Sequence, residues 1–425
     1  MLLPLPGLVG AVHVDAQSEW REAPSSTREY AFAKRHLESS FSGYGATDVL
    51  VPPFAVVALS HFAAGLMNVW VAEKERQVEV ATLLDEVVRR ATHPSVVPSS
   101  LGDRRPFDAT SLDDENLYLS HLGVILGIRR IVACAEGRQC PNAEATDAMH
   151  ERVVKHLRER TLASPLAHAP SYPDSPMWPA DQAVTLLALR LYDGIHHTDL
   201  LDAPLTGWLA AMRKHADPAT GLFHSSVSSL EYATTPRGCA LSWTSLYLAQ
   251  VEPKVARDQY ERYREHMGAD VLGIGGFREW PVDRTKGGMD ADSGPVIGGV
   301  GVAATGLGLG PAKLFGDTDR YTAIRRAALT FGVPSVFSSH GYDTAPILGE
   351  AILFHGRTAR AWFGPPLPPL SVPRASAFSV WSLGLLLGYL AALVVWLRRS
   401  VAVLRKVVGQ AQLNCAARVE VRCTR

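Results

Sequence analysis

The segment FAVVALSHFAAGLMNVWVAEKE (residues 54–75), followed at once by VEVATLLDEVVRRA (78–91), contains the pattern that decides the fold. The first segment is almost wholly apolar, which is typical of a helix surrounded by protein. The second is amphipathic at the helical period, which is typical of a helix with one face in solvent. Together they predict a hairpin of one inner and one outer helix.

The same alternation recurs along the chain. Apolar segments start near residues 116, 181, 239, 295 and 347, and an amphipathic segment follows each of the first four. We count about eleven helices, and no run shows the period-2 alternation of a strand. Six such hairpins over residues 27–364 predict an all-α (α,α)6 toroid. Acids and aromatics in the loops would then gather at one end of the inner helices.

Composition narrows the classes of function. The chain has 42 basic and 42 acidic residues among 425, so no basic surface for nucleic acid is expected. Among its five cysteines, Cys134 and Cys140 lack the spacing of a zinc or redox site, although they could close a small disulfide loop. We therefore expect neither a metal nor a cofactor. A homo-oligomer is left open.

The C-terminal part predicts a membrane anchor. A proline-rich linker (365–375) precedes an uncharged apolar run (376–397) with tryptophans near its ends. At 1.5 Å per residue, such a helix crosses a hydrocarbon core of about 30 Å. The tail (398–425) carries seven basic residues and one acid, which predicts a cytoplasmic tail and an extracytoplasmic main domain in a single-pass protein of the cell membrane. The alternative is a buried core helix.

The N-terminal residues are consistent with that orientation. Residues 1–26 start with a short apolar stretch, and a V-x-A tripeptide before Gln17 is typical of a cleavage site. No basic region precedes the stretch. We therefore interpret residues 1–26 as an apolar leader, a truncated or atypical signal.

The segment REWPVDRTKGGMDADSGPVIGGVG (278–301) is the first candidate for chemistry. Three of its acids, Glu279, Asp290 and Asp292, lie among glycines, prolines and Trp280. Buried carboxyl groups without partners shift their pKa values or bind something. An indole beside a carboxyl desolvates it, which favours Glu279 as a general acid. The alternative for Asp292 is a cap of the next helix.

Six blocks in order resemble the linalool dehydratase/isomerase family, over about residues 54–364. They include ENLYLSHLGVILG (115–127), WPADQAVTLLALRLYDGIHHTDL (178–200), WLAAMRKHADPATGLF (208–223) and LGEAILF (348–354). The other two are SWTSLYLAQVEPKVARDQYERYREHM (242–267) and the segment from Arg278 to Asp317. The resemblance implies an (α,α)6 barrel and acid/base removal of water from, or isomerisation of, an allylic alcohol.

The resemblance also implies site residues. The family's pocket histidine matches His121, and its catalytic cysteines match Asp181 and Tyr172, neither of which is a cysteine. Cys239 lies elsewhere in the sequence. Asp181 at the start of an apolar helix is either a pocket acid or a cap. His121 is either a ligand-binding residue or a satisfied core histidine, and His61 is expected to be a core histidine.

The candidate site residues follow from these arguments. The expected catalytic residues are Asp181, Glu279, Asp292 and His121, and the expected substrate-binding residues are Trp178, Trp280, Asp290, Asn116, Arg237, Trp243 and Tyr342. The leading hypothesis is a membrane-anchored lyase or isomerase that acts on a hydroxylated, terpenoid-like small molecule. One alternative is a carbohydrate-active hydrolase or lyase on the same toroid, since paired carboxylates with tryptophans also suit glycans. A further alternative is a non-catalytic receptor with a degenerate pocket.

Overall fold

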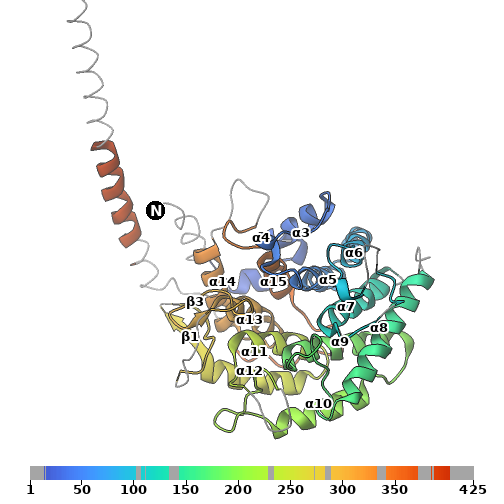
Figure 1. Cartoon of the computed structure of the whole chain (residues 1–425). Coiled ribbons are helices and arrows are strands. Elements are labelled where there is room, and N and C mark those ends of the chain that lie inside the picture. Colours follow the sequence, from blue (N-terminus) through green and yellow to red (C-terminus); the bar gives the residue numbers. More distant parts are fainter. Residues whose placement is uncertain are drawn as a thin grey trace, which may run out of the picture.

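Six apolar helices form a closed inner ring in the computed structural model. The structure describes residues 14, 16–101, 107–110, 112–133, 143–227, 234–271, 273–282, 289–332, 341–371, 384 and 387–402. The ring helices are α5 (Phe54–Ala72), α7 (Asn116–Ala133), α9 (Pro179–His196), α11 (Gly238–Leu248), α13 (Val302–Leu314) and α15 (Ile347–Thr358). Each packs against the next, and α15 packs back against α5 (Figure 1).

A second layer of amphipathic helices surrounds the ring. It consists of α3 (Arg28–Glu38), α6 (Gln77–Ala91), α8 (Ala143–Ala163), α10 (Asp202–Lys214), α12 (Pro253–Met267) and α14 (Thr318–Gly332). Helix α6 lies against α5 and α7, α8 against α7 and α9, and α3 against α15 and α6. Short helices α2 (Ala16–Arg21), α4 (Ala46–Val49), η1 (Pro24–Ser26), η2 (Lys74–Arg76) and η3 (Ser99–Leu101) complete the helical elements. The predicted toroid of helical hairpins is confirmed for the described residues, which are mostly helical and contain a few short strands.

The inner helices run parallel to one another, because residues further along one helix contact residues further along its neighbour. Between α7 and α9, Ser120 contacts Thr185 and Gly127 lies against Leu191; between α5 and α15, His61 contacts His355 and Asn68 contacts Thr358. Their N-terminal ends therefore share one rim of the ring. Side chains in the second and third turns lie one layer below this rim.

Two short hairpins interrupt the helical pattern. Strand β1 (Gly268–Val271) pairs antiparallel with β2 (Ile274–Phe277), and β3 (Val296–Ile297) pairs with β4 (Val300–Gly301). The expectation of no strands is wrong at these places, because strands of two to four residues that contain glycine show no alternation. The hairpins hold the chain on either side of Glu279 at the rim, where the Glu279 amide donates to the Gly299 carbonyl oxygen at 3.0 Å.

The predicted C-terminal transmembrane helix is not supported. Residues 376–383 and 385–386 of the predicted span lie outside the described residues, and residues 387–402 form a helix that stands away from the ring (Figure 1). Among the described helices, the one that is long and apolar enough to span a membrane is α5, which is mostly buried in the ring. An apolar helix of that length is also what the centre of a toroid requires, so composition does not separate the two cases.

The two ends of the predicted domain contact the ring. Residues 16–26, assigned to the leader, belong to the helical body: Glu19 pairs with Arg325 of α14 at 2.8 Å, and Glu22 pairs with Arg357 of α15. The predicted linker is also attached, since the Leu370 amide donates to the Phe315 carbonyl oxygen at 2.9 Å. Apart from Val14, the remaining residues of the leader lie outside the described residues, as do most of the basic tail and Cys134 and Cys140.

Candidate functional site

Asp181 lies in the first turn of α9, at the rim. Pro179 starts this helix, which suits a residue that has no amide hydrogen to donate. The Asp181 carboxyl is half-buried and accepts a hydrogen bond from the Ser171 hydroxyl, and it does not cap the helix. Burial raises its pKa to about 7, against the lowering effect of Ser171, and the charge of Asp292 raises it further. Asp181 can therefore hold a proton near neutral pH.

The loop that carries Ser171 is fixed to the start of α7. The Asn116 side-chain amide donates to the Pro170 carbonyl oxygen at 2.6 Å, and the Leu117 amide donates to the Ser171 carbonyl oxygen at 3.1 Å. Asn116, expected to bind substrate, thus positions the partner of Asp181. Its buried side-chain oxygen has no hydrogen-bond partner among the described residues.

Arg237, just before α11, joins the acids of the second segment. Its Nε donates to Glu279 Oε1 at 2.8 Å, its Nη1 lies 2.8 Å from Asp290 Oδ2, and its guanidinium carbon lies 4.8 Å from the centre of the Trp280 ring. Glu279 is fully buried, and this burial raises its pKa in spite of Cys239 and Arg237. Burial also opposes the ionisation of Asp290, but Arg237 outweighs it and lowers the pKa of Asp290.

Cys239 belongs to the same cluster, although the sequence placed it apart from the site. Its buried thiol donates to Glu279 Oε1 at 3.1 Å, and its amide donates to Glu279 Oε2 at 3.3 Å. Burial, followed by the charge of Glu279, raises the pKa of the thiol well above its usual value. The thiol is therefore a protonated hydrogen-bond donor and no nucleophile at neutral pH.

Asp292 lies in an exposed turn beside this cluster. The turn is closed by the Ser293 amide, which donates to Asp290 Oδ1 at 2.8 Å. Helix α13 starts nine residues beyond this turn, at Val302, so Asp292 does not cap it. Neighbouring residues of the chain partly bury the Asp292 carboxyl. This burial raises its pKa, and the negative charge of Asp290 raises it further.

Below the rim, three histidines and two aromatic residues form an inner cluster from four of the ring helices. His61 Nδ1 lies 3.0 Å from His355 Nδ1. The ring of Trp243 lies edge-on to His61 and His121, with centroid separations of 6.0 and 5.6 Å, and Tyr247 lies within 6.0 Å of all three histidine rings. His61, expected to be a core histidine, is thus part of a polar contact in the ring.

Several polar atoms of this inner cluster lack partners. Both nitrogens of His121, Nε2 of His61 and Nε1 of Trp243 have no hydrogen-bond partner among the described residues. A buried polar group without a partner costs about 1–3 kcal/mol. These atoms are available to bind water or a ligand.

Charge couples the rim to the inner cluster. The charge of Asp181 acts on Tyr247 and on Tyr172, and the charge of Asp292 acts on Cys239 and Tyr172. One rim therefore carries four acids, which form the rim cluster: Asp181, Glu279, Asp290 and Asp292. Trp243, Tyr247 and the histidines lie beneath them. Ser171, Tyr247 and His355 were not among the predicted residues. Nothing in their local sequence distinguishes them from ordinary loop and core residues.

The two remaining aromatic candidates have different positions. Trp178 precedes α9 and is half-buried, edge-on to Tyr172 at 6.3 Å. Tyr342 does not line the site: its buried hydroxyl donates to Glu29 at 2.8 Å and accepts from Arg325 at 2.9 Å. These bonds place Tyr342 in a network of buried ions that joins α3 to α14.

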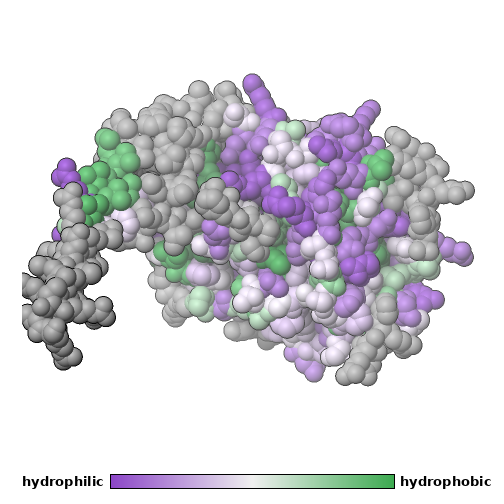
Figure 2. Space-filling model, turned by 90° about the horizontal axis from the view of Figure 1, so that it is seen from above, coloured by the Kyte–Doolittle hydropathy of each residue, from purple (hydrophilic) through white to green (hydrophobic). Residues whose placement is uncertain are grey.

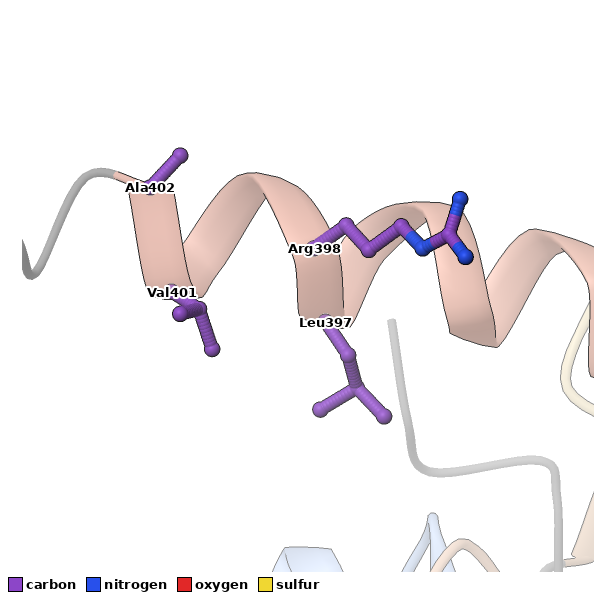
Figure 3. Close-up of a pocket in the computed structure, with 4 residues that line it drawn as sticks. All are labelled: Leu397, Arg398, Val401 and Ala402. Atoms are coloured by element: carbon purple, nitrogen blue, oxygen red, sulfur yellow. The ribbon is translucent and has the colours of Figure 1, made fainter.

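A surface pocket on the C-terminal helix is a poor site for chemistry. Figure 3 shows its lining residues Leu397, Arg398, Val401 and Ala402, all from one helix. They include no acid, no nucleophile and no histidine. The candidate functional site is therefore the rim cluster together with the inner cluster.

Comparison with solved structures gives a likeness at low sequence identity. No family model and no curated protein matches the chain. Among solved structures, the chain is similar to a GH76 α-mannanase of Bacteroides thetaiotaomicron, with a TM-score of 0.42 and 10% identity. The likeness covers 83% of this chain and 97% of the mannanase chain. At this level it carries no argument about activity, so the function is argued from the side chains of this chain.

The leading hypothesis from the sequence needs correction. Membership of the linalool dehydratase/isomerase family is not shown. The predicted dehydratase or isomerase activity is corrected: no family model and no curated protein supports it, and the solved structure named above is that of a glycoside hydrolase.

Proposed function

We propose that this protein is a carbohydrate-active hydrolase that cleaves a glycosidic bond at the N-terminal rim of the ring. Asp181 is the general acid and Asp292 is the second carboxylate. The observation that carries the proposal is the pairing of these two groups. One holds a proton near neutral pH, the other lies on an exposed turn, and the charge of Asp292 acts on Asp181.

Glycoside hydrolysis needs these two roles. A carboxylic acid protonates the leaving oxygen, and a carboxylate attacks the sugar or activates a water. Asp181 can supply the proton, with the Ser171 hydroxyl holding its carboxyl in place. Arg237 binds Asp290 at 2.8 Å and thereby anchors the turn on which Asp292 stands. Two titratable groups in different environments are a common sign of such an acid and base pair.

The test measures the release of reducing sugar from neutral polysaccharides by the full chain. The general-acid contribution is typically about 10²–10⁴-fold, so Asp181→Asn should lower turnover by that order, and Asp292→Asn should lower it strongly. Asp202→Asn is the matched control, since Asp202 also lies in the first turn of a helix but is exposed on the outer layer. Wild-type turnover should fall as the pH rises through about 7, where Asp181 loses its proton.

The outcomes separate the rival functions. Full activity in both Asp181→Asn and Asp292→Asn would refute the assignment of roles. Saccharide binding without any release of sugar by the wild type would favour the non-catalytic receptor instead. Unsaturated sugar products would indicate a lyase, in which a proton is removed and no water is added.

We also propose that the C-terminal segment attaches the protein to the cell membrane, with the main domain outside the cytoplasm. The proposal is supported by a helix whose apolar side chains, such as Leu387 and Val395, are exposed and are followed by Arg398 (Figure 2). Flotation with phosphatidylethanolamine and phosphatidylglycerol vesicles tests it. Replacing Leu387, Val395 and Leu397 by serine should abolish flotation, and equal flotation of both proteins would contradict the proposal.

A further inference from the structure

The inner cluster contains more hydrogen-bonding capacity than the protein itself uses. His61 comes from α5, His121 from α7, Trp243 and Tyr247 from α11, and His355 from α15. Four nitrogens on three of these side chains have no partner among the described residues. Trp243 is half-buried whereas the histidines and Tyr247 are fully buried, so Trp243 forms the accessible side of the cluster.

The cluster also carries no charge at neutral pH. Burial lowers the pKa of His121 and of His355 to about 3, and burial followed by the neighbouring histidines lowers the pKa of His61 well below its usual value. Burial raises the pKa of Tyr247, so its phenol stays protonated. The charge of Asp181 acts on Tyr247, and Asp181 itself holds a proton near neutral pH.

The unpartnered nitrogens and the lack of charge define the chemistry of a ligand that can bind to the inner cluster. A neutral imidazole offers one donor and one acceptor, and an indole nitrogen offers a donor alone. A hydroxyl group both donates and accepts, so a ring with several hydroxyls satisfies such a set. A carboxylate, phosphate or ammonium group would lose its hydration without meeting an opposite charge. A hydrocarbon would leave the same nitrogens without partners.

We infer that the inner cluster binds a neutral, polyhydroxylated sugar ring, with Trp243, His121 and His61 as its hydrogen-bonding residues. The inference rests on the proposed function and narrows it to substrates whose bound unit carries no ionic group. The half-buried indole of Trp243 adds an apolar surface for the C–H groups of the ring. The rim acids then lie above the bound unit, where a glycosidic oxygen can reach Asp181.

The experiment measures binding by calorimetry in the full-length Asp181→Asn protein, so that turnover does not consume the ligand. The neutral probes are mannotriose, cellotriose and xylotriose, and the anionic probe is trigalacturonate. At least one neutral trisaccharide should bind at least tenfold more tightly than trigalacturonate. Trp243→Phe, which removes one donor, and His121→Gln should each weaken that binding at least tenfold.

Trp208→Phe is the matched control. Trp208 lies on the outer helix α10, and its indole nitrogen also lacks a partner among the described residues, so the change is chemically the same at a place away from the ring. It should leave binding unchanged. Circular dichroism on each variant separates a loss of fold from a loss of contacts.

Each outcome bears on the inference. Binding that depends on Trp243 and His121, without hydrolysis by the wild type, supports the inference and refutes the hydrolase. Hydrolysis by the wild type with binding that is insensitive to both variants refutes the inference and leaves the hydrolase in place. Tighter binding of trigalacturonate, or no binding of any neutral probe, overturns the inference.

Discussion

Replacement of Asp181 by asparagine should make the protein more stable at alkaline pH. Folding raises the pKa of Asp181 from 3.8 to about 7 because the carboxyl is buried. The stability that this group contributes is fully present below the pKa of the unfolded chain and is lost as the pH rises through about 7. Three pKa units at 1.36 kcal/mol each give a loss of about 4 kcal/mol between pH 4 and pH 8. Solvent at the half-buried carboxyl makes this an upper limit.

Asparagine resembles the neutral carboxyl in shape and cannot ionise, so the variant avoids this loss. We expect the free energies of unfolding of the two proteins to be similar at pH 4, and the variant to be more stable by up to about 4 kcal/mol at pH 8. Urea unfolding followed by circular dichroism at a series of pH values measures the difference, and subtraction of the two curves removes the effect of all other titrating groups. A difference that does not change between pH 4 and pH 8 would refute the pKa assigned to Asp181.

Two further predictions concern the Arg237 cluster. Arg237→Met leaves Glu279 buried without its opposite charge, and removal of one partner of a buried ion pair costs about 3–5 kcal/mol. Urea unfolding measures this loss of stability. An unchanged urea midpoint would contradict the contact between Arg237 and Glu279. Cys239→Ser keeps a donor beside Glu279, so sugar release should stay near the wild-type rate, and the native thiol should resist iodoacetamide until the protein is unfolded. Rapid labelling of the folded protein, or loss of activity in the serine variant, would mean that the thiol takes part in the chemistry.

Most of the fold could be predicted from the sequence because the signal is local. The apolar run of α5 and the amphipathic run of α6 each contain their own pattern, and the alternation alone implies two layers. The hairpins could not be predicted, since a strand such as β3 has only two residues and shows no alternation. It pairs with β4 through the short turn that joins them. The predicted C-terminal transmembrane helix is not supported by the structure, because residues 376–383 and 385–386 of the predicted span lie outside the described residues.

The candidate site could be predicted only in part. Asp181, Glu279 and Asp292 lie in apolar or glycine-rich stretches of sequence. An acid in such a stretch is unusual, and this identified the three residues as candidates. Tyr247 and His355 lie on apolar helices without such a conflict, and closure of the ring brings them to His61. Tyr342 was predicted from its aromatic side chain. The structure shows instead that its hydroxyl donates to Glu29 and accepts from Arg325, which form an ion pair. No local sequence pattern indicates these contacts.

Arg237 lowers the pKa of one acid of the rim, Asp290, whereas the pKa of Asp181 stays raised. Six helices start at this rim, and a helix N-terminus stabilises a nearby carboxylate by about 0.3–1 kcal/mol. That is less than one pKa unit, whereas burial raises the pKa of Asp181 by about three units, so the helix ends cannot restore its charge. Asp290 lies at the same rim and is lowered in pKa, because Arg237 binds it directly and does not reach Asp181. The rim therefore contains a protonated acid, Asp181, and an ionised one, Asp290, whose ion pair with Arg237 holds the turn that carries the proposed second carboxylate, Asp292.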